Sequence, residues 1–285
     1  MKKIVKKLVY KLIPSSKRIM EILDSIPQTP MPWDEAAVQL HQLRLDVLRI
    51  GRPQYLYGLL CAARTAQAIG EKCFTAIEFG VAGGRGLIAM ERYAEIIEKK
   101  QNIQVQIVGF DASSGLPSST NPLDCPFAFR GGEFPMDEEK LRSRIKRAEL
   151  RLGDVAQTVQ DFIKGSFAPI GFVSNDLDLY TSTRDSFALF HAKSQCLLPR
   201  IAMYFDDLIG YPYTTINGEW AAIKEFNAIS PHRQIGQIYG LKYYIGLHYR
   251  FEPWTDMFFM LDVLDHPNYN LPEKTSMPDL RLRET

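Results

Sequence analysis

The segment Ala76-Ile-Glu-Phe-Gly-Val-Ala-Gly-Gly-Arg-Gly86 decides the expected fold. Its apolar first half predicts a buried strand, and a helix is predicted to follow its glycines. Glycines at a strand-to-helix turn let the backbone bend sharply and approach a ligand closely. We therefore predict that Gly80, Gly83 and Gly84 form a ligand-binding turn. Such a turn alone is shared by nucleotide-binding folds and by purely structural turns.

Strand-like and helix-like segments alternate from about residue 73 onward. Short apolar runs predict strands at 74–79, 105–110, 170–173 and 201–205. Helices are predicted between them, near 86–99, 137–150, 183–196 and 219–229. This alternation favours parallel strands joined by crossover helices. Late apolar runs near 234–247 and 257–264 supply the final strands, with an antiparallel pair as one option. The sequence thus predicts an α/β protein with a doubly wound, Rossmann-like sheet.

The 285 residues divide into three predicted regions. Helical stretches at about 34–50 and 54–69 end at glycines that serve as stop signals. With the segment before them they form an N-terminal helical extension, residues 1–70. Residues 71–266 form the α/β domain, and residues 267–285 form a polar, proline-bearing tail that we expect to be a loose end.

Composition and charge exclude several classes of protein. The formal net charge of +1 gives no reason to expect a nucleic-acid partner. The cysteines form no C-x-x-C pair, which argues against a zinc knuckle and against a disulfide framework, so we expect reduced thiols. No apolar run reaches the roughly 18 residues of a spanning helix. A cytoplasmic location is expected. The cysteines are Cys61, Cys73, Cys125 and Cys196.

Residues 1–20 combine apolar residues at helical spacing with lysines between them. The lysines interrupt what would be the apolar core of a signal peptide, so that interpretation is disfavoured. An amphipathic helix is predicted instead, and two placements stay open. It packs on the body or on a partner subunit, which would make the protein a homo-oligomer, or it contacts a membrane surface at the cytoplasmic side.

Two carboxylates restrict the kinds of ligand that the glycine turn could bind. Glu78 lies two residues before Gly80, and Asp111 ends the next predicted strand. In dinucleotide-binding folds an acid at the second strand's end holds a ribose diol, and the ribose of a methyl donor needs the same acceptor. Glu78 is placed to neutralise the donor's methionine ammonium. Capping of a helix or a turn is the alternative role for both acids.

Asp154 is a third candidate for the donor site. It follows Leu150-Arg-Leu-Gly153, where a third strand would end, and its carboxylate could accept from an adenine amino group. A simple Asx turn after Gly153 explains this residue equally well.

A second set of acids follows the next two predicted strands. Asp176 and Asp178 follow one strand, and Asp206 and Asp207 follow the other. Carboxyl ends of neighbouring strands line the ligand crevice of a doubly wound sheet, where such carboxylates repel unless protons or a cation offset their charge. An oxygen-rich set suits Mg²⁺ better than zinc or copper. Because adjacent strand residues point to opposite sides, Asp206 and Asp207 converge only if a turn begins there.

These acids suggest a chemistry. A divalent ion polarises an aliphatic hydroxyl and lowers its pKa, and a positioned carboxylate takes the proton as the oxygen attacks the methyl group in line. A metal-free site with one catalytic aspartate is the alternative. Asp178 could also cap the 183–196 helix, and Ser182 with Asp185 has the spacing of a capping box. Tyr211, Tyr213 and Trp220 are candidates for lining an acceptor pocket.

Three motifs together resemble the macrocin O-methyltransferase family: Asp-Leu-Asp-Leu-Tyr-Thr-Ser-Thr at 176–183, the Asp206-Asp207 pair, and Gly109-Phe-Asp-Ala-Ser-Ser-Gly-Leu-Pro117. The resemblance spans about residues 74–230. It implies a class I, S-adenosylmethionine-dependent methyltransferase that uses Mg²⁺ and methylates a hydroxyl of a sugar or another polar small molecule. It further implies that Asp176, Asp206 and Asp207 ligate the metal and that Asp178 is the general base.

Two other classes of function stay open. An NAD(P)-dependent oxidoreductase could use a similar fold, although the spacing from Gly80 to Asp111 exceeds the usual interval of about 20 residues. No Tyr-x-x-x-Lys pair follows the fourth predicted strand. A non-catalytic interaction protein that keeps the donor pocket is the second alternative.

Overall fold

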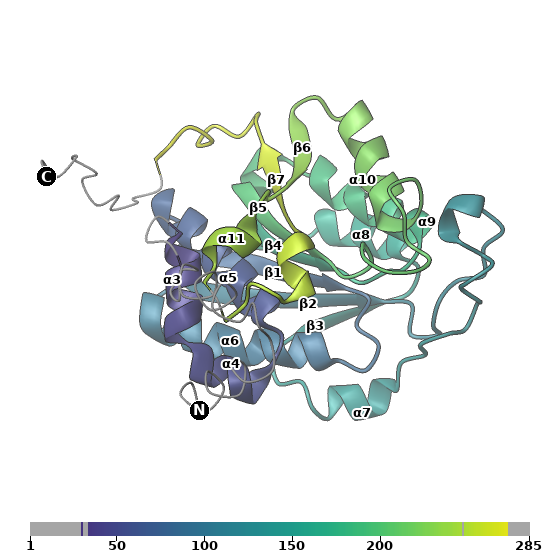
Figure 1. Cartoon of the computed structure of the whole chain (residues 1–285), viewed down its shortest axis with the longest axis horizontal. Coiled ribbons are helices and arrows are strands. Elements are labelled where there is room, and N and C mark those ends of the chain that lie inside the picture. The colour runs from purple at the N-terminus through teal and green to yellow at the C-terminus, as the bar shows by residue number, and fades with distance from the viewer. Residues whose placement is uncertain (1–29, 31–33, 247, 273–285) are drawn as a thin grey trace, which may run out of the picture.

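The structure is a computed structural model that describes residues 30, 34–246 and 248–272. Within these residues a single sheet is covered by helices on both faces (Figure 1). The predicted amphipathic helix of residues 1–20 lies outside the described residues and stays a prediction. In the described part of the chain, no helix combines the length and the apolar character that crossing a bilayer requires.

Seven strands form the sheet in the order β3-β2-β1-β4-β5-β7-β6. The strands from β1 to β5 pair in parallel, whereas β7 runs antiparallel to both β5 and β6. This order differs from the dinucleotide-binding order 3-2-1-4-5-6 by an antiparallel strand inserted between the last two, the arrangement of class I methyltransferase sheets. The predicted doubly wound, Rossmann-like fold is confirmed. The bounds are β1 Cys73–Phe79, β2 Gln104–Asp111, β3 Glu149–Leu152, β4 Ile170–Asn175, β5 Leu197–Phe205, β6 Arg233–Gln237 and β7 Phe258–Val263.

Helices cover the sheet as two layers (Figure 1). One layer contains α3 (Glu35–Gln42), α4 (Arg44–Ile50), α5 (Pro53–Ala68) and α6 (Arg85–Gln101). The other contains α8 (Val155–Ile163), α9 (Tyr180–Ser186) and α10 (Gly218–Ile229). Because α5 packs directly on β4 and β5, the described part of the predicted helical extension belongs to the covering layer of the sheet. The division of the chain at residues 70 and 266 stays a prediction.

Two predicted helices are wrong in extent. The helix expected at 137–150 is the short α7 (Glu138–Arg142), because the amides of residues 146–148 donate to the buried carboxylate of Glu91 and lead into β3. The helix expected at 183–196 begins at Tyr180 and ends at Ser186, and short 3-10 turns follow it. The late run at 234–247 likewise contains β6 and then the short α11 (Leu241–Tyr244).

The beginning of the predicted tail is not a loose end. The Tyr269 hydroxyl donates to Asp262 Oδ1 at 2.9 Å, and Arg200 Nη1 donates to the carbonyl oxygen of Tyr269 at 2.8 Å. Asp262 lies on β7 and Arg200 on β5, so the residues around 269 are tied to the sheet. Residues 273–285 lie outside the described part. The four cysteines are free thiols, as predicted.

The switch in strand order positions the candidate site. The chain leaves β1 for β2 on one side and returns to β4 on the other, so a crevice opens at the carboxyl ends of β1 and β4. Backbone bonds continue past these ends: the Asp176 amide donates to Phe79 and the Asp206 amide donates to Asn175, both at 2.9 Å. Gly80 has φ +78°, and a Cβ there would lie 1.7 Å from the Asp176 carbonyl oxygen. Only glycine permits this close approach.

Candidate active site

A cavity of about 900 Å³ lies at the carboxyl ends of these strands. Its size falls in the range of small-molecule sites. The residues that line it include, on one flank, Glu78, Gly80, Gly83, Asp111 and Asp154, and on the other flank Asp176, Asp178, Asp206 and Asp207. Gly84 is the exception among the predicted site residues. It precedes α6 with φ +73°, and a Cβ there would meet Leu141 at 2.1 Å, so Gly84 serves packing against α7.

Glu78 is a buried acid on the first of these flanks, which carries the predicted donor-binding residues and is called the donor flank below. The Tyr55 hydroxyl donates to its Oε1 at 2.6 Å, and Ser174 Oγ donates to the Tyr55 hydroxyl at 3.1 Å. No hydrogen bond from a described residue reaches the buried Oε2. Burial raises the pKa of Glu78 to about 7, against the lowering effects of the Tyr55 bond and of Arg52. A cationic group of a ligand would satisfy the unpartnered oxygen.

Asp111 connects the end of β2 to the glycine turn. Its Oδ2 accepts from the amides of Val81 and Ala82, each at 2.8 Å, and its Oδ1 accepts from the Ser113 amide at 2.6 Å. Asp111 therefore does cap a turn, which was its alternative role. Because Oδ1 accepts only one of these bonds, it keeps a second lone pair, and since Asp111 lines the cavity this oxygen is also free to accept from a ribose.

Asp154 lies on the rim of the donor flank. It is the N-cap of α8, where its Oδ1 accepts from the Ala156 amide at 2.9 Å. The strand predicted before Asp154 is present as β3, and the side chain of Asp154 is exposed. Capping accounts for its local geometry, and its place in the cavity lining is compatible with an adenine contact.

Three aspartates converge on the opposite flank. Asp176, Asp206 and Asp207 each offer a carboxylate oxygen, and these oxygens all lie within 4.8 Å of one another. Residues 206 and 207 converge because β5 ends at Phe205 and a bend begins directly after it, which was the condition for their convergence. Burial, and then the neighbouring Asp206, raise the pKa of Asp176 to about 8. The cluster therefore holds repelling negative charge that a cation would relieve.

Asp178 and Asp207 share one hydroxyl. The Tyr213 hydroxyl lies 2.8 Å from Asp178 Oδ1 and 2.8 Å from Asp207 Oδ1, and the Asp178 amide donates to Asp207 Oδ2 at 2.8 Å. Since a hydroxyl carries one hydrogen, it can donate to only one of the two carboxylates. Burial raises the pKa of both acids. Asp178 has φ +58°, and this contact fixes its side chain beside the metal-ligand candidates.

Three further residues belong to the site although no local sequence signal indicates them. Arg52 lines the cavity with its Nη1 4.0 Å from Asp206 Oδ1, and Tyr55 holds Glu78. Glu219 is fully buried and accepts from the Asp207 amide at 3.1 Å, rather than serving only to open a helix. Arg52 and Tyr55 come from the start of α5, so only the packing of that helix on the sheet brings them here.

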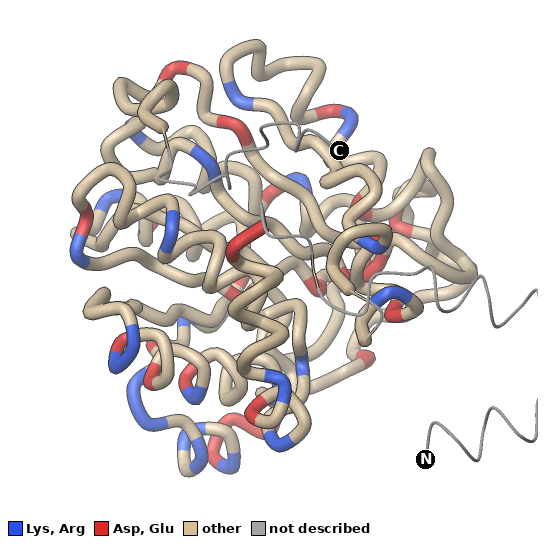
Figure 2. Tube along the Cα trace, turned by 60° about the vertical axis from the view of Figure 1, so that its left-hand side comes forward, with Lys and Arg blue, Asp and Glu red and all other residues tan. Residues whose placement is uncertain are grey.

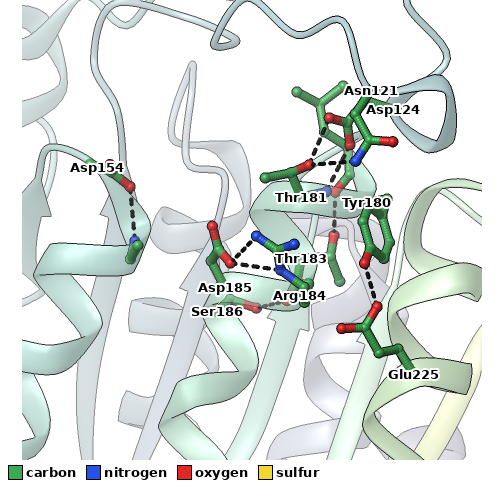
Figure 3. Close-up of polar contacts among 12 residues, drawn as sticks. Asn121, Asp124, Asp154, Tyr180, Thr181, Thr183, Arg184, Asp185, Ser186 and Glu225 are labelled. Atoms are coloured by element: carbon green, nitrogen blue, oxygen red, sulfur yellow. Dashed lines mark hydrogen bonds and ion pairs between the residues drawn. The ribbon is translucent and has the colours of Figure 1, made fainter.

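The remaining candidates have structural roles. Helix α9 begins after Leu179 without a side-chain cap, so both the predicted capping box of Ser182 with Asp185 and capping by Asp178 are wrong. Asp185 instead pairs with Arg184 at 2.7 Å (Figure 3). Among the described residues that line the cavity, none of the proposed aromatics appears: Tyr211 is exposed, Tyr213 acts through its hydroxyl, and Trp220 packs against Phe259.

Asp124 ties the segment that follows β2 to the first turn of α9 (Figure 3). Its carboxylate is 1% exposed and accepts from the Thr181 amide and the Thr181 hydroxyl, both at 2.7 Å, and from the Ser119 hydroxyl. Thr181 lines the cavity, as do Gly115, Leu116 and Pro117 of that segment. Asp124 therefore holds the wall of the cavity in place.

Replacing Asp124 with alanine is expected to lower the unfolding free energy by about 2 kcal/mol, because it leaves the half-buried amide and hydroxyl of Thr181 and the Ser119 hydroxyl without their acceptor. Proteolysis within residues 112–137 should become faster. Urea unfolding and limited proteolysis measure the two effects. The matched control is Asp161→Ala, whose side chain is 70% exposed and pairs with Lys164 on the surface. That change should stay within about 0.5 kcal/mol. Equal losses in the two variants would contradict the role of Asp124.

Comparison with known proteins gives likenesses of fold. No family model matches the chain, and no curated protein matches it. Among solved structures, CalS11, a calicheamicin methyltransferase, is 20% identical over 72% of this chain and 88% of its own, with a TM-score of 0.46. The O-methyltransferase NovP is 16% identical over 62% of this chain and 72% of its own, with a TM-score of 0.46. TomG of Streptomyces achromogenes, an O-methyltransferase solved in complex with S-adenosylmethionine, is 15% identical over 86% of this chain and 94% of its own, with a TM-score of 0.41.

Likenesses at this level do not define a function. The Rossmann-like methyltransferase fold is assigned from the strand order of the sheet itself, with its antiparallel β7 between β5 and β6. The activity is argued from the cavity.

Proposed function

We propose that this protein is an S-adenosylmethionine-dependent O-methyltransferase that methylates a hydroxyl of a small polar molecule, with sugars as the favoured class. One observation carries the proposal: the glycine turn with its acids and the converging aspartates are two flanks of the same cavity. A donor bound on the first flank and a hydroxyl bound on the second would lie within one cavity. Methyl transfer needs this proximity.

The donor flank fits the polar groups of S-adenosylmethionine. The unpartnered Oε2 of Glu78 suits the methionine ammonium, and Asp111 suits the ribose hydroxyls. Gly86 makes room beside Glu78, since a Cβ there would lie 1.8 Å from Glu78 Oε1.

The second flank fits a hard divalent cation such as Mg²⁺. The oxygens of Asp176, Asp206 and Asp207 lie close enough to share one ion, and oxygen-only sets are typical of Mg²⁺. The nearest cation among the described groups, Arg52 Nη1, is 4.0 Å from Asp206 Oδ1 and so offsets only part of the charge. When bound, the ion would polarise an acceptor hydroxyl and lower its pKa.

Asp178 is the proposed general base. Tyr213 holds Asp178 through Oδ1, which leaves Oδ2 to receive the hydroxyl proton. As the proton moves to Asp178, the oxygen–carbon bond forms, the carbon–sulfur bond breaks, and S-adenosylhomocysteine leaves. Tyr213 and Arg52 position the carboxylates on this flank, and Asp124 holds Thr181, which also lines the cavity.

The proposal is tested by thermal-shift measurements of the full chain with S-adenosylmethionine, S-adenosylhomocysteine, NAD⁺ and NADP⁺. Both sulfur compounds, at about 100 times their Kd, should raise the melting temperature by about 5 °C or more. Stabilisation by a nicotinamide cofactor alone would make the protein an oxidoreductase and reject the proposal. Donor binding without metal affinity or turnover would favour a non-catalytic binding protein.

A further inference from the structure

A second cavity of about 440 Å³ lies beside the donor flank. It is bounded by the turn between α4 and α5 and by one face of α6, and four arginines line it: Arg52, Arg85, Arg92 and Arg144. Three of them, all except Arg92, also line the large cavity. The two cavities therefore meet at shared side chains, and Arg52 stands at their junction beside Asp206.

Every charged residue that lines the small cavity is positive, and its other described lining residues are apolar or glycine. Figure 2 shows basic and acidic residues interspersed along the trace, whereas no acid is among the described residues that line this cavity. No hydrogen bond or ion pair from a described residue reaches the side chains of Arg85 or Arg92, and Arg144 contacts the Gly83 carbonyl oxygen at 3.5 Å. Guanidinium groups gathered in a concave site without carboxylates raise the local concentration of anions.

The spacing of the arginines exceeds the size of one carboxylate. Arg85 and Arg92 lie seven residues apart on α6, which is two helical turns or about 10 Å along the axis. The methionine carboxylate of the donor can engage the end near the glycine turn, where Arg85 begins the helix. Arg92, with Ile88 and Ala89, lies further along the helix and lines only the small cavity. A second anionic group on a ligand would pair with it.

We infer that the small cavity binds a phosphate or diphosphate group carried by the methyl acceptor. Arginine pairs with phosphate oxygens through parallel N–H donors, so a phosphate chain suits several guanidinium groups in a row. With its phosphate beside Arg92, the rest of the acceptor extends past Arg52 to place its hydroxyl at the aspartates. The link to the acceptor depends on the proposed function, whereas the anion site itself does not.

Calorimetry with inorganic pyrophosphate tests the inference, using the full chain in metal-free buffer at fixed ionic strength. Arg92→Gln is expected to weaken pyrophosphate binding by about tenfold or more, because charge-assisted hydrogen bonds are lost. The matched control is Lys100→Gln, on the same helix but outside both cavities, which should bind pyrophosphate like the unchanged protein. Both variants should melt within about 2 °C of the unchanged protein, since both side chains are exposed.

The donor product S-adenosylhomocysteine and inorganic phosphate separate the alternative occupants. S-adenosylhomocysteine should bind Arg92→Gln within about twofold of the unchanged protein, because Arg92 lies outside the donor cavity. Loss of its binding in Arg92→Gln would assign the arginines to the donor carboxylate and overturn the inference. The inference would also be overturned if the unchanged protein did not bind pyrophosphate. It would be overturned as well if orthophosphate bound as tightly as pyrophosphate and Arg92→Gln changed neither affinity. If S-adenosylhomocysteine fails to bind the unchanged protein, the proposed function fails while the pyrophosphate result still decides the anion site.

Discussion

Replacing Asp111 with alanine is expected to weaken S-adenosylhomocysteine binding by about 100-fold, to the limit of calorimetric detection. Two effects combine. The variant loses the acceptor for the ribose hydroxyls, and it leaves the amides of Val81 and Ala82 without the oxygen that holds the glycine turn in its binding conformation. Hydrogen bonds to charged groups contribute about 1.5–3 kcal/mol each, so losing two of them accounts for this factor.

Two comparison variants sharpen this prediction. Asp111→Asn keeps one acceptor oxygen, which can serve the turn or the ribose but not both, and an intermediate affinity is expected. Asp154→Ala removes an exposed N-cap of α8 and should lower stability by about 1 kcal/mol with a much smaller change in affinity. If Asp111→Ala bound S-adenosylhomocysteine as tightly as the unchanged protein, the donor site as described would be excluded.

The sequence predicts the arrangement of the glycine turn and its two acids well because the signals are local. The apolar run, the glycines and the acid two residues before Gly80 all lie on one strand–turn–helix unit, and the structure has β1 and α6 there. Asp111 follows from the same logic, since it ends the adjacent parallel strand. Short-range patterns of this kind depend little on the rest of the chain.

Features that depend on tertiary contacts could not be predicted. The five-residue length of α7 depends on Glu91, which comes from α6 and accepts the amides that a longer helix would have used. Arg52 enters the site from a helix that precedes the sheet in sequence, with only the Gly-Arg-Pro turn as a local sign of a helix start. Gly84 looks like a ligand contact in sequence, yet its neighbour is Leu141.

The aspartate cluster lies between these cases. The order of the strands predicts that Asp176 and Asp206 end at the same edge, and the backbone bond from Asp206 to Asn175 places them there. Whether Asp207 joins them depends on where β5 ends, because one more strand residue would turn its side chain away. The bend after Phe205 brings Asp207 to the cluster, and Glu219 holds its amide.

Replacing Asp176 with asparagine is expected to reduce Mn²⁺ or Mg²⁺ affinity by about 100-fold and to abolish turnover, while S-adenosylhomocysteine affinity stays unchanged. The reason is charge: one of three ligand carboxylates becomes neutral at almost constant shape. The stability of the metal-free protein should stay the same or rise, since the substitution removes like-charge repulsion and no described side chain donates a hydrogen bond to Asp176. Removing metal with a chelator should reproduce the loss of turnover in the unchanged protein.

Asp185→Asn is the matched control, because Asp185 lines the same cavity but pairs with Arg184 away from the cluster. Its metal affinity should equal that of the unchanged protein. Mn²⁺ binding followed by electron paramagnetic resonance, with melting temperature and donor calorimetry on the same samples, separates a metal ligand from a structural acid. A structural acid would lower stability and leave metal affinity intact in Asp176→Asn. Full turnover of the unchanged protein in excess chelator would reject a role for the metal. The aspartate cluster would then be left with a role in proton transfer alone.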